Sequence, residues 1–194
     1  MDAALANYIE ELHRHGVAHD STRPDRLERL RNVEPDTARL LAVLVRATGA
    51  RRLLEIGTSN GYSTLWLADA ARSVGGRIVS VEIDPARSAT ALEHLRATGL
   101  AEHVELRTED AATTLAGSAD AAWDMIFLDA ERPAYAGYWP DLLRTLRDGG
   151  LLVVDNVLSH ADEVRAFRAL VSGEPGVSEA LAPTGAGALL IVKR

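Results

Sequence analysis

From Arg52 onward, short apolar segments typical of buried strands alternate with segments of helical character. Strands are predicted at 52–56, 77–82, 103–107, 124–128 and 151–155, and helices at 61–72, 85–98, 135–147 and 160–172. Such alternation predicts a mostly parallel sheet with helices on both faces. Two further strands, near 177–182 and 187–193, are joined by a link too short for a crossover helix, so they are expected to form an antiparallel hairpin. We therefore expect an α/β fold with a seven-stranded, mostly parallel sheet that ends in this hairpin.

The segment before the first strand is expected to be helical. Two short helices are predicted at Leu5–Leu12 and Arg26–Leu30, and Pro35 is suited to the first turn of a third helix that runs to about Thr48. No linker, repeat or low-complexity segment interrupts the chain, and 194 residues is the length of one ordinary domain. We therefore expect a single domain over 1–194, with an N-terminal helical cap at 1–48 and an α/β core at 52–194.

Composition excludes several classes of function. The chain has no cysteine, which rules out disulfides, thiolate metal ligands and a cysteine nucleophile. The net charge of −7 and the lack of a long basic tract argue against a nucleic-acid partner. The first residues show neither a signal peptide nor a membrane span, so a cytoplasmic protein without a membrane partner is expected. The only basic cluster, Arg23, Arg26, Arg29 and Arg31, is predicted to lie on a solvated helix face.

The segment Leu53–Ala68, LLEIGTSNGYSTLWLA, predicts a strand that passes through a glycine turn into a helix whose first turn favours an anion. Its E-x-G-x-x-x-G spacing differs from the G-x-G-x-x-G dinucleotide fingerprint and disfavours NAD. Glu82 ends the next predicted strand, about twenty residues beyond Gly61, where a carboxylate can accept hydrogen bonds from ribose hydroxyls. The pattern is similar to the S-adenosylmethionine (SAM) site of Rossmann-like methyltransferases. The alternative is a structural glycine turn in an α/β crossover.

Acidic and amide side chains follow the predicted strands, at the edge where parallel sheets bind ligands. Asp129 follows the fourth strand, and Asp155 and Asn156 follow the fifth. If these strands are neighbours, two carboxylates and an amide oxygen stand side by side. Such a set suits a hard divalent cation, Mg²⁺ above all, with Mn²⁺ or Ca²⁺ as alternatives. Alternatively, these residues simply cap the helices that follow.

Several segments together resemble the metal-dependent class I O-methyltransferases, the family that includes catechol and caffeoyl-CoA O-methyltransferases. They are LEIGTSNGYSTLWLA, VSVEID, DMIFLDAERPAYAGYW, LRDGGLLVVDN and LAPTGAGALLIVKR, and they cover most of the chain. The resemblance implies a Rossmann-like class I methyltransferase fold that uses SAM and a divalent cation. It also implies a small catechol-like or hydroxylated aromatic acceptor and a homodimer.

The resemblance implies roles for individual residues. The implied SAM-binding residues are Val33, Glu55, Gly57, Ser59, Gly61, Tyr62, Ser63, Glu82, Ile83, Asp110, Ala111 and Asp129. Within this set, Glu55, Gly57 and Ser63 would hold the methionine end, Glu82 the ribose and Ile83 the adenine. Asp129, Asp155 and Asn156 would hold the metal.

Relatives of this kind place a lysine just after the first metal aspartate, where this chain has Arg132. Arginine can stabilise an oxyanion or bind an acidic substrate, but it cannot accept a proton. Three explanations therefore stay open: the metal alone acidifies the hydroxyl, Glu131 or His160 takes the proton, or the activity has changed. The candidate catalytic residues are Asp129, Arg132 and His160.

Two alternative functions follow from the same features. A tRNA nucleoside methyltransferase is suggested by the N-terminal arginines, and a non-catalytic SAM-binding module by the missing lysine. Tyr135, Tyr138 and Trp139 could line the acceptor site, but their helical spacing predicts that at least two of them pack in the core.

Overall fold

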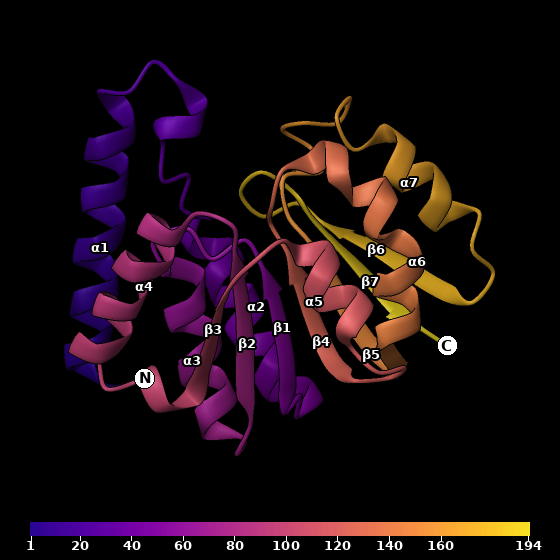
Figure 1. Ribbon diagram of the computed structural model, residues 1–194, viewed down its shortest axis with the longest axis horizontal. Coiled ribbons are helices and arrows are strands. Elements are labelled where there is room, and N and C mark those ends of the chain that lie inside the picture. Colours follow the sequence, from indigo (N-terminus) through magenta and orange to yellow (C-terminus); the bar gives the residue numbers. More distant parts are fainter.

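The computed structural model describes residues 1–194 and contains a seven-stranded sheet in the order β3-β2-β1-β4-β5-β7-β6 (Figure 1). Strands β1 to β5 pair in parallel, whereas β7 is antiparallel to both β5 and β6. The bounds are Arg52–Ile56 (β1), Arg77–Glu82 (β2), Val104–Thr108 (β3), Trp123–Leu128 (β4), Leu146–Val154 (β5), Val177–Ala182 (β6) and Ala188–Lys193 (β7). The predicted α/β fold, with its mostly parallel sheet and C-terminal antiparallel hairpin, is confirmed.

Seven α-helices and three short 3-10 turns connect the strands. The helices are Ala3–Ser21 (α1), Pro35–Thr48 (α2), Tyr62–Ser73 (α3), Pro85–Ala97 (α4), Ala111–Gly117 (α5), Tyr135–Thr145 (α6) and Arg165–Ser172 (α7). The 3-10 turns are Arg26–Glu28, Ala101–His103 and Arg132–Ala134. None of the helices has the length and apolar character needed to cross a lipid bilayer.

The sheet separates two apolar cores, because successive side chains of a strand point to opposite faces. Leu53 belongs to one core, with side chains from α1 to α4, and Leu54 belongs to the other, with side chains from α5 to α7. In Figure 1, α1 to α4 lie beside the β1–β3 half of the sheet, and α6 and α7 lie beside its β5–β7 end. The crossovers thus change face between β1 and β4, which is where open α/β sheets bind ligands.

Asp124 fixes the register of the central strands at their amino ends. Its carboxylate accepts hydrogen bonds from the backbone N–H groups of Arg51 and Arg52, at 2.9 and 2.8 Å, and from the side chains of Arg52 and Arg147. Burial alone would raise the pKa of Asp124, but these hydrogen bonds and charges lower it to about 2. β1, β4 and β5 are thereby held together, so the loops at their opposite ends start from fixed positions.

Several predicted boundaries were wrong. α1 runs to Ser21 instead of ending at Leu12, and its buried face continues through Gly16, which packs against Asn32. The predicted helix at 26–30 is a single 3-10 turn, Arg26–Glu28. Helix α5 was not predicted, because seven residues that include two threonines give little helical signal; Asp110 caps it by accepting from Ala112 N at 2.7 Å.

The predicted boundaries after residue 145 also needed correction. β5 begins at Leu146 instead of 151, because Leu146 pairs with Trp123 before a break in register, and this shortens the helix predicted to reach 147. The last helix begins at Arg165 instead of 160, because residues 157–164 form turns. The division into a helical cap and a core stays a prediction.

Candidate functional site

A cavity of about 600 Å³ opens at the carboxyl ends of β1, β2, β4 and β5. Its walls come from the loops that follow these strands and from residues 26–34, here called the wall segment. The sequence-predicted residues that line it are Val33, Gly57, Ser59, Tyr62, Ser63, Glu82, Ile83, Asp110, Ala111, Asp129, Arg132, Asp155, Asn156 and His160. Two predicted residues, Glu55 and Gly61, lie next to the cavity without lining it.

The loop between β1 and α3 requires glycine at Gly57. Its φ of +104° is in the region that favours glycine, and an added Cβ would lie 2.1 Å from the backbone oxygen of Asp129. Gly61, with φ of +85°, then forms the N-cap of α3. The loop thus brings the first turn of α3, with its free N–H groups, to the cavity beside the end of β4.

Glu82, at the end of β2, braces this loop and faces the cavity. Its Oε2 accepts a hydrogen bond from Ser59 N at 2.8 Å, and its Oε1 accepts one from Asp84 N at 3.0 Å. A carboxylate oxygen can accept more than one hydrogen bond, so both oxygens keep a free lone pair. Glu82 can therefore bind two neighbouring hydroxyl groups, as a ribose would present them. Ile83, the next residue, exposes 68 % of its surface at the same end of the cavity.

Glu55, near the end of β1, does not itself line the cavity. Its side chain is fully buried, and its oxygens accept hydrogen bonds from the hydroxyls of Ser63, Thr64 and Ser80 at 2.6, 2.5 and 2.6 Å. Burial raises the pKa of Glu55 to about 7, although these three hydrogen bonds oppose the rise. The predicted role of Glu55 in holding SAM stays a prediction; its carboxyl group accepts a hydrogen bond from Ser63, which lines the cavity.

Asp129, Asp155 and Asn156 come together at the ends of β4 and β5, which are neighbours as predicted. Asn156 Nδ2 donates to Asp129 Oδ1 at 2.9 Å and to Asp155 Oδ2 at 3.1 Å, and a half-turn of the amide would put its oxygen in the same place. These separations match the roughly 3 Å between adjacent oxygen ligands of a cation held at about 2.1 Å. Burial raises the pKa of both carboxyl groups, and the charge of Asp129 raises the pKa of Asp155 further.

This group fits a divalent cation. Asp155 Oδ1 is buried and has no hydrogen-bond partner, which is costly unless a positive charge or a donor meets it. No cluster of three or more His, Cys, Asp or Glu side chains has metal-binding geometry, so a cation here would depend on two carboxylates and the amide oxygen. Two carboxylates with an amide leave coordination positions open for a substrate.

Arg132 lies beside this group on the 3-10 turn Arg132–Ala134 and is only 3 % exposed. Its Nε donates to Glu163 Oε2 at 2.8 Å, whereas its Nη2 is buried without a partner. His160, also on the cavity wall, has its Nδ1 2.8 Å from Ser159 Oγ. Burial and then the charge of Arg132 lower the pKa of His160, so its imidazole is neutral near pH 7.

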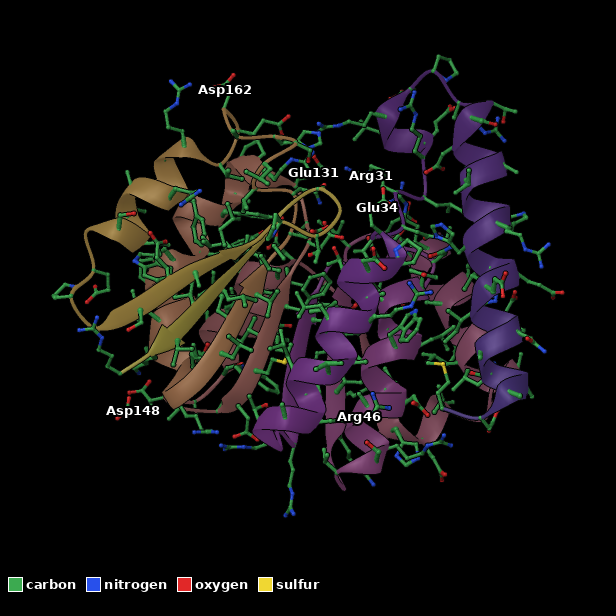
Figure 2. The ribbon with its side chains drawn as sticks, turned by 180° about the vertical axis from the view of Figure 1, so that it is seen from behind. Arg31, Glu34, Arg46, Glu131, Asp148 and Asp162 are labelled. Atoms are coloured by element: carbon green, nitrogen blue, oxygen red, sulfur yellow. The ribbon has the colours of Figure 1, made fainter.

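The N-terminal arginines do not form the solvated helix face that the sequence predicted. Arg26, Arg29 and Arg31 line the cavity. Arg31 Nη2 lies 2.8 Å from Glu131 Oε1, and Arg26 pairs with Glu131 and Glu163 at 3.0 and 3.1 Å. Figure 2 shows Arg31 and Glu131 next to each other. The difference has a physical reason. The only helix in this segment is the single 3-10 turn Arg26–Glu28, which is too short to form a helix face, and Glu131 and Glu163 lie close enough to pair with Arg26 and Arg31.

Buried polar atoms without partners are concentrated here. Seven residues carry such atoms, and four of them, Asn32, Asn60, Arg132 and Asp155, line the cavity. Asn60 was missed by the sequence reasoning, although its place between the two glycines of the loop was a usable signal. Of the three aromatic residues considered, Tyr135 and Trp139 pack in the core, as predicted for at least two, and Tyr138 lines the cavity.

Comparison with known proteins identifies relatives for most of the chain. A family model described as O-methyltransferase matches residues 2–169. A catechol O-methyltransferase of Niastella koreensis is 37 % identical over 130 residues, which are 66 % of this chain and 58 % of that protein. A catechol O-methyltransferase of Mycobacterium tuberculosis is 36 % identical over 156 residues, 75 % of this chain and 70 % of that protein. The matched part of this chain therefore spans less than two thirds of the first of these relatives.

Solved structures agree with this fold. An O-methyltransferase from Bacillus cereus, in complex with SAH (S-adenosylhomocysteine), superposes with a TM-score of 0.81 at 28 % identity. The superposition covers 97 % of this chain and 91 % of that chain.

Proposed function

The chain belongs to the SAM-dependent O-methyltransferase family, and from this premise we propose that it moves the methyl group of SAM to a hydroxyl of a small catechol-like or otherwise hydroxylated aromatic acceptor. One observation carries the proposal: a single cavity joins the glycine loop and Glu82 at one end to Asp129, Asp155 and Asn156 at the other. The first end has the groups to bind a nucleoside, and the second has the groups to bind paired oxygens. The expected homodimer stays a prediction.

The cofactor end of the cavity is assigned by the chemistry of its side chains. Glu82 would accept hydrogen bonds from the ribose hydroxyls, and the exposed face of Ile83 would pack on the adenine. Asp110 and Ala111, at the start of α5, would meet the edge of that base. The remaining predicted contacts, Val33, Gly57, Ser59, Tyr62 and Ser63, also line the cavity, and the methionine part would lie against Gly57 and Ser63.

Asp129, Asp155 and Asn156 would hold a divalent cation. When bound, such a cation lowers the pKa of an acceptor hydroxyl and fixes two neighbouring oxygens of the acceptor. The chain's own residues contribute position and charge. Gly57 lets the cofactor loop approach Asp129 closely, and the buried guanidinium of Arg132 adds a fixed positive charge beside the acceptor. His160, neutral near pH 7, is the candidate proton acceptor on the cavity wall.

The test is transfer of a labelled methyl group from SAM to a panel of aromatic diols, with and without EDTA. Wild type is expected to methylate at least one diol and to lose most of that rate in EDTA. Asp129→Asn should lower the rate by about a hundredfold or more, because it removes a charge from both the cation site and the transfer site. The control, Asp162→Asn, changes an aspartate that is 89 % exposed and should leave the rate unchanged.

Two outcomes would contradict the proposal. SAH binding without transfer to any diol would favour a non-catalytic SAM-binding module. Transfer to tRNA, with a rate that falls steeply as salt rises, would favour the nucleic-acid alternative. Two of the four arginines that suggested tRNA, Arg26 and Arg31, are paired with Glu131 and Glu163 in the cavity, which argues against that acceptor.

A further inference from the structure

Arg132 holds a buried, unused hydrogen-bond donor at the acceptor end of the cavity. We propose that Arg132 binds the acceptor as an oxyanion through Nη2, and that the enzyme therefore selects acceptors whose hydroxyl loses its proton readily. This inference rests on the proposed function, because it concerns the acceptor of that reaction. It names a narrower substrate class: aromatic diols made acidic by an electron-withdrawing substituent.

The turn that carries Arg132 is rigid. Tyr135 Oη donates to Ala130 O and accepts from Ala130 N, both at 3.1 Å, which closes residues 130–135 into a compact loop. Tyr135 itself is fully buried, and Pro133 restricts the backbone between them. The Cα of Arg132 is therefore held in place before any ligand arrives. A donor fixed in this way need not reorganise when charge develops on the ligand.

The guanidinium group is also held in one orientation. Nε donates to Glu163 Oε2 at 2.8 Å, and Glu163 is in turn paired with Arg26 at 3.1 Å. Arg26 also bonds to Glu131, so the wall segment braces the whole arrangement. Because the guanidinium is planar, fixing Nε fixes the direction in which Nη2 points.

No contact within the protein accounts for the buried position of Arg132 Nη2. It has no hydrogen-bond partner, and Arg132 is only 3 % exposed, so water does not readily replace the missing partner. A buried charged donor left unpaired is strongly unfavourable, and such groups in native proteins call for a specific explanation. Arg132 lines the cavity, and an anionic oxygen of a ligand would satisfy Nη2.

The position of Arg132 relative to the other residues identifies which ligand that is. Arg132 follows Asp129 by three residues on the loop after β4, and both line the same cavity as Asp155 and His160. The oxygens that bind beside Asp129 and Asp155 are those of the methyl acceptor. Nη2 is therefore placed for an acceptor oxygen and not for the nucleoside, which binds near Glu82.

The chemistry of arginine then restricts the acceptor. A guanidinium keeps its proton under all ordinary conditions, so Arg132 can stabilise an oxyanion but cannot create one. In the transfer, the bond from sulfur to the methyl carbon breaks as the bond from oxygen to that carbon forms, and the sulfonium becomes a neutral thioether. The acceptor proton has by then left, to His160 or to water, so the transfer depends on how readily the acceptor hydroxyl ionises. A phenol with a pKa of about 10 is ionised only to about one part in a thousand at pH 7, whereas a hydroxyl with a pKa near 7 is about half ionised.

Binding of 4-nitrocatechol tests the inference directly, because its absorbance distinguishes the neutral molecule from the anion. Dissociation constants are measured from about pH 5 to about pH 9 with SAH bound, once in EDTA and once in Mg²⁺. Arg132→Gln is expected to weaken binding of the anion about tenfold or more in both conditions and to leave binding of the neutral form unchanged. Arg132→Lys keeps the charge and should restore part of the affinity.

Arg165→Gln is the matched control, since Arg165 is 78 % exposed and lies two residues from Glu163 in sequence. It should bind the anion as wild type does. Equal affinity of wild type and Arg132→Gln for the anion would overturn the inference, as would failure of wild type to bind nitrocatechol in either form. Retained SAH binding shows that a variant is folded.

Kinetics provide a second, independent readout. At pH 7, the ratio of kcat/KM for 4-nitrocatechol to that for catechol should exceed about ten in wild type. Arg132→Lys should lower this ratio, because a lysine can take the proton from the less acidic acceptor. The same ratio in wild type and Arg132→Lys would overturn the inference. If neither acceptor is methylated, the proposed function fails, and the binding measurements still decide the role of Arg132.

Discussion

Gly57 is the residue at which the two ends of the cavity meet. β1 and β4 are neighbours, so the turn that leaves β1 passes directly over the start of the loop that follows β4. The N–H of Asp129 donates to Ile56 O at 2.9 Å, and the carbonyl of Asp129 lies where a side chain on Gly57 would be. The cofactor loop and the first candidate metal ligand therefore share one backbone contact, which couples the geometry of the two sites.

Replacing Gly57 with alanine should damage both sites at once. The new Cβ would collide with backbone that cannot move aside, at a φ that alanine avoids, and we expect a loss of about 2–4 kcal/mol in unfolding free energy. The Gly57→Ala variant should also lose SAH binding. Urea unfolding and calorimetric titration measure the two effects. Gly117→Ala is the control: nothing lies within 4 Å of its added Cβ, so stability should change by less than about 1 kcal/mol. A stable Gly57→Ala variant that binds SAH would contradict this account of the loop.

The sequence predicted the residues of the site that follow strands, and missed those that reach it from elsewhere. Glu82, Asp129 and Asp155 were predictable because the carboxyl ends of parallel strands meet at one edge. Arg31 was not, because its distance from Glu131 depends on how a segment without regular structure crosses the sheet edge. The direction in which the Glu55 side chain points was not predictable either, since it depends on hydroxyls from α3 and β2. The catalytic and binding roles of the site residues stay predictions.

Among the elements, the wall segment is held by contacts to four different parts of the molecule. Leu30 O accepts from Ser59 Oγ of the cofactor loop at 2.8 Å, and Arg31 pairs with Glu131 beyond β4. Arg87 of α4 donates to Leu27 O and Arg29 O at 2.5 and 3.1 Å. Asp20, at the end of α1, accepts from the backbone N–H groups of Leu30 and Arg31 at 2.7 and 2.9 Å.

Asp20 stands in the last turn of α1, where the helix dipole disfavours a negative charge. Burial would also raise its pKa, yet the hydrogen bonds from His19 and from the two N–H groups lower it. The Asp20 carboxylate is thus kept where the helix dipole disfavours its charge, because it holds the backbone N–H of Arg31. The φ of Arg31, +53°, is unusual for a residue with a side chain.

Asp20→Ala should therefore weaken cofactor binding more than it weakens the fold. Without the carboxylate, the wall segment loses its anchor to α1, and we expect the dissociation constant of SAH to rise about tenfold, or about 1.4 kcal/mol. The melting temperature should fall by only a few degrees, because the segment contributes little to either core. Asp36→Ala removes an aspartate that is 76 % exposed and serves as the control. An unchanged SAH affinity in Asp20→Ala would show that the wall segment does not need this anchor.

At the level of elements, the sequence predicted the strands and helices that apolar spacing marks. It missed boundaries that depend on pairing between strands. The seven strands and the helix Pro35–Thr48 were predicted because apolar spacing and a first-turn proline mark them locally. The start of β5 was not, because Leu146 belongs to the strand through its pairing with Trp123, across a break in register. The length of α1 could have been predicted, since Leu5, Ile9, Leu12 and Gly16 keep helical spacing to the end.

Across the whole molecule, the carboxyl groups whose pKa is raised lie at one edge of the sheet. Glu55, Asp129 and Asp155 are all at the carboxyl ends of β1, β4 and β5, and burial raises the pKa of each. Grouping them is unfavourable for folding, because each must lose hydration and Asp129 repels both of the others. This grouping lowers the stability of the fold, and the proposed function would explain it, since a bound cation would compensate the charge of Asp129 and Asp155.

Stability should therefore depend on pH and on metal together. A carboxyl group with a raised pKa binds its proton more tightly in the folded state, so folding takes up protons and stability falls as pH rises. For Asp155 the fall extends from about pH 4, the ordinary range of aspartate, to the raised value of about 7. In EDTA, the melting temperature should decrease between about pH 5 and about pH 8. Mg²⁺ should raise it, and by more at the higher pH, where both carboxylates are ionised and ready to bind.

Asp155→Asn separates this effect from the titration of Glu55. The variant keeps the shape of the side chain but removes one buried charge, so in EDTA at about pH 8 it should be more stable than wild type. It should also lose most of the increase in melting temperature that Mg²⁺ gives to wild type, whereas the exposed control Asp162→Asn should keep that increase (Figure 2). Thermal unfolding with SAH present at constant concentration measures all three proteins. An equal effect of Mg²⁺ on wild type and Asp155→Asn would mean that the cation binds elsewhere, and the buried carboxylates would then need another explanation.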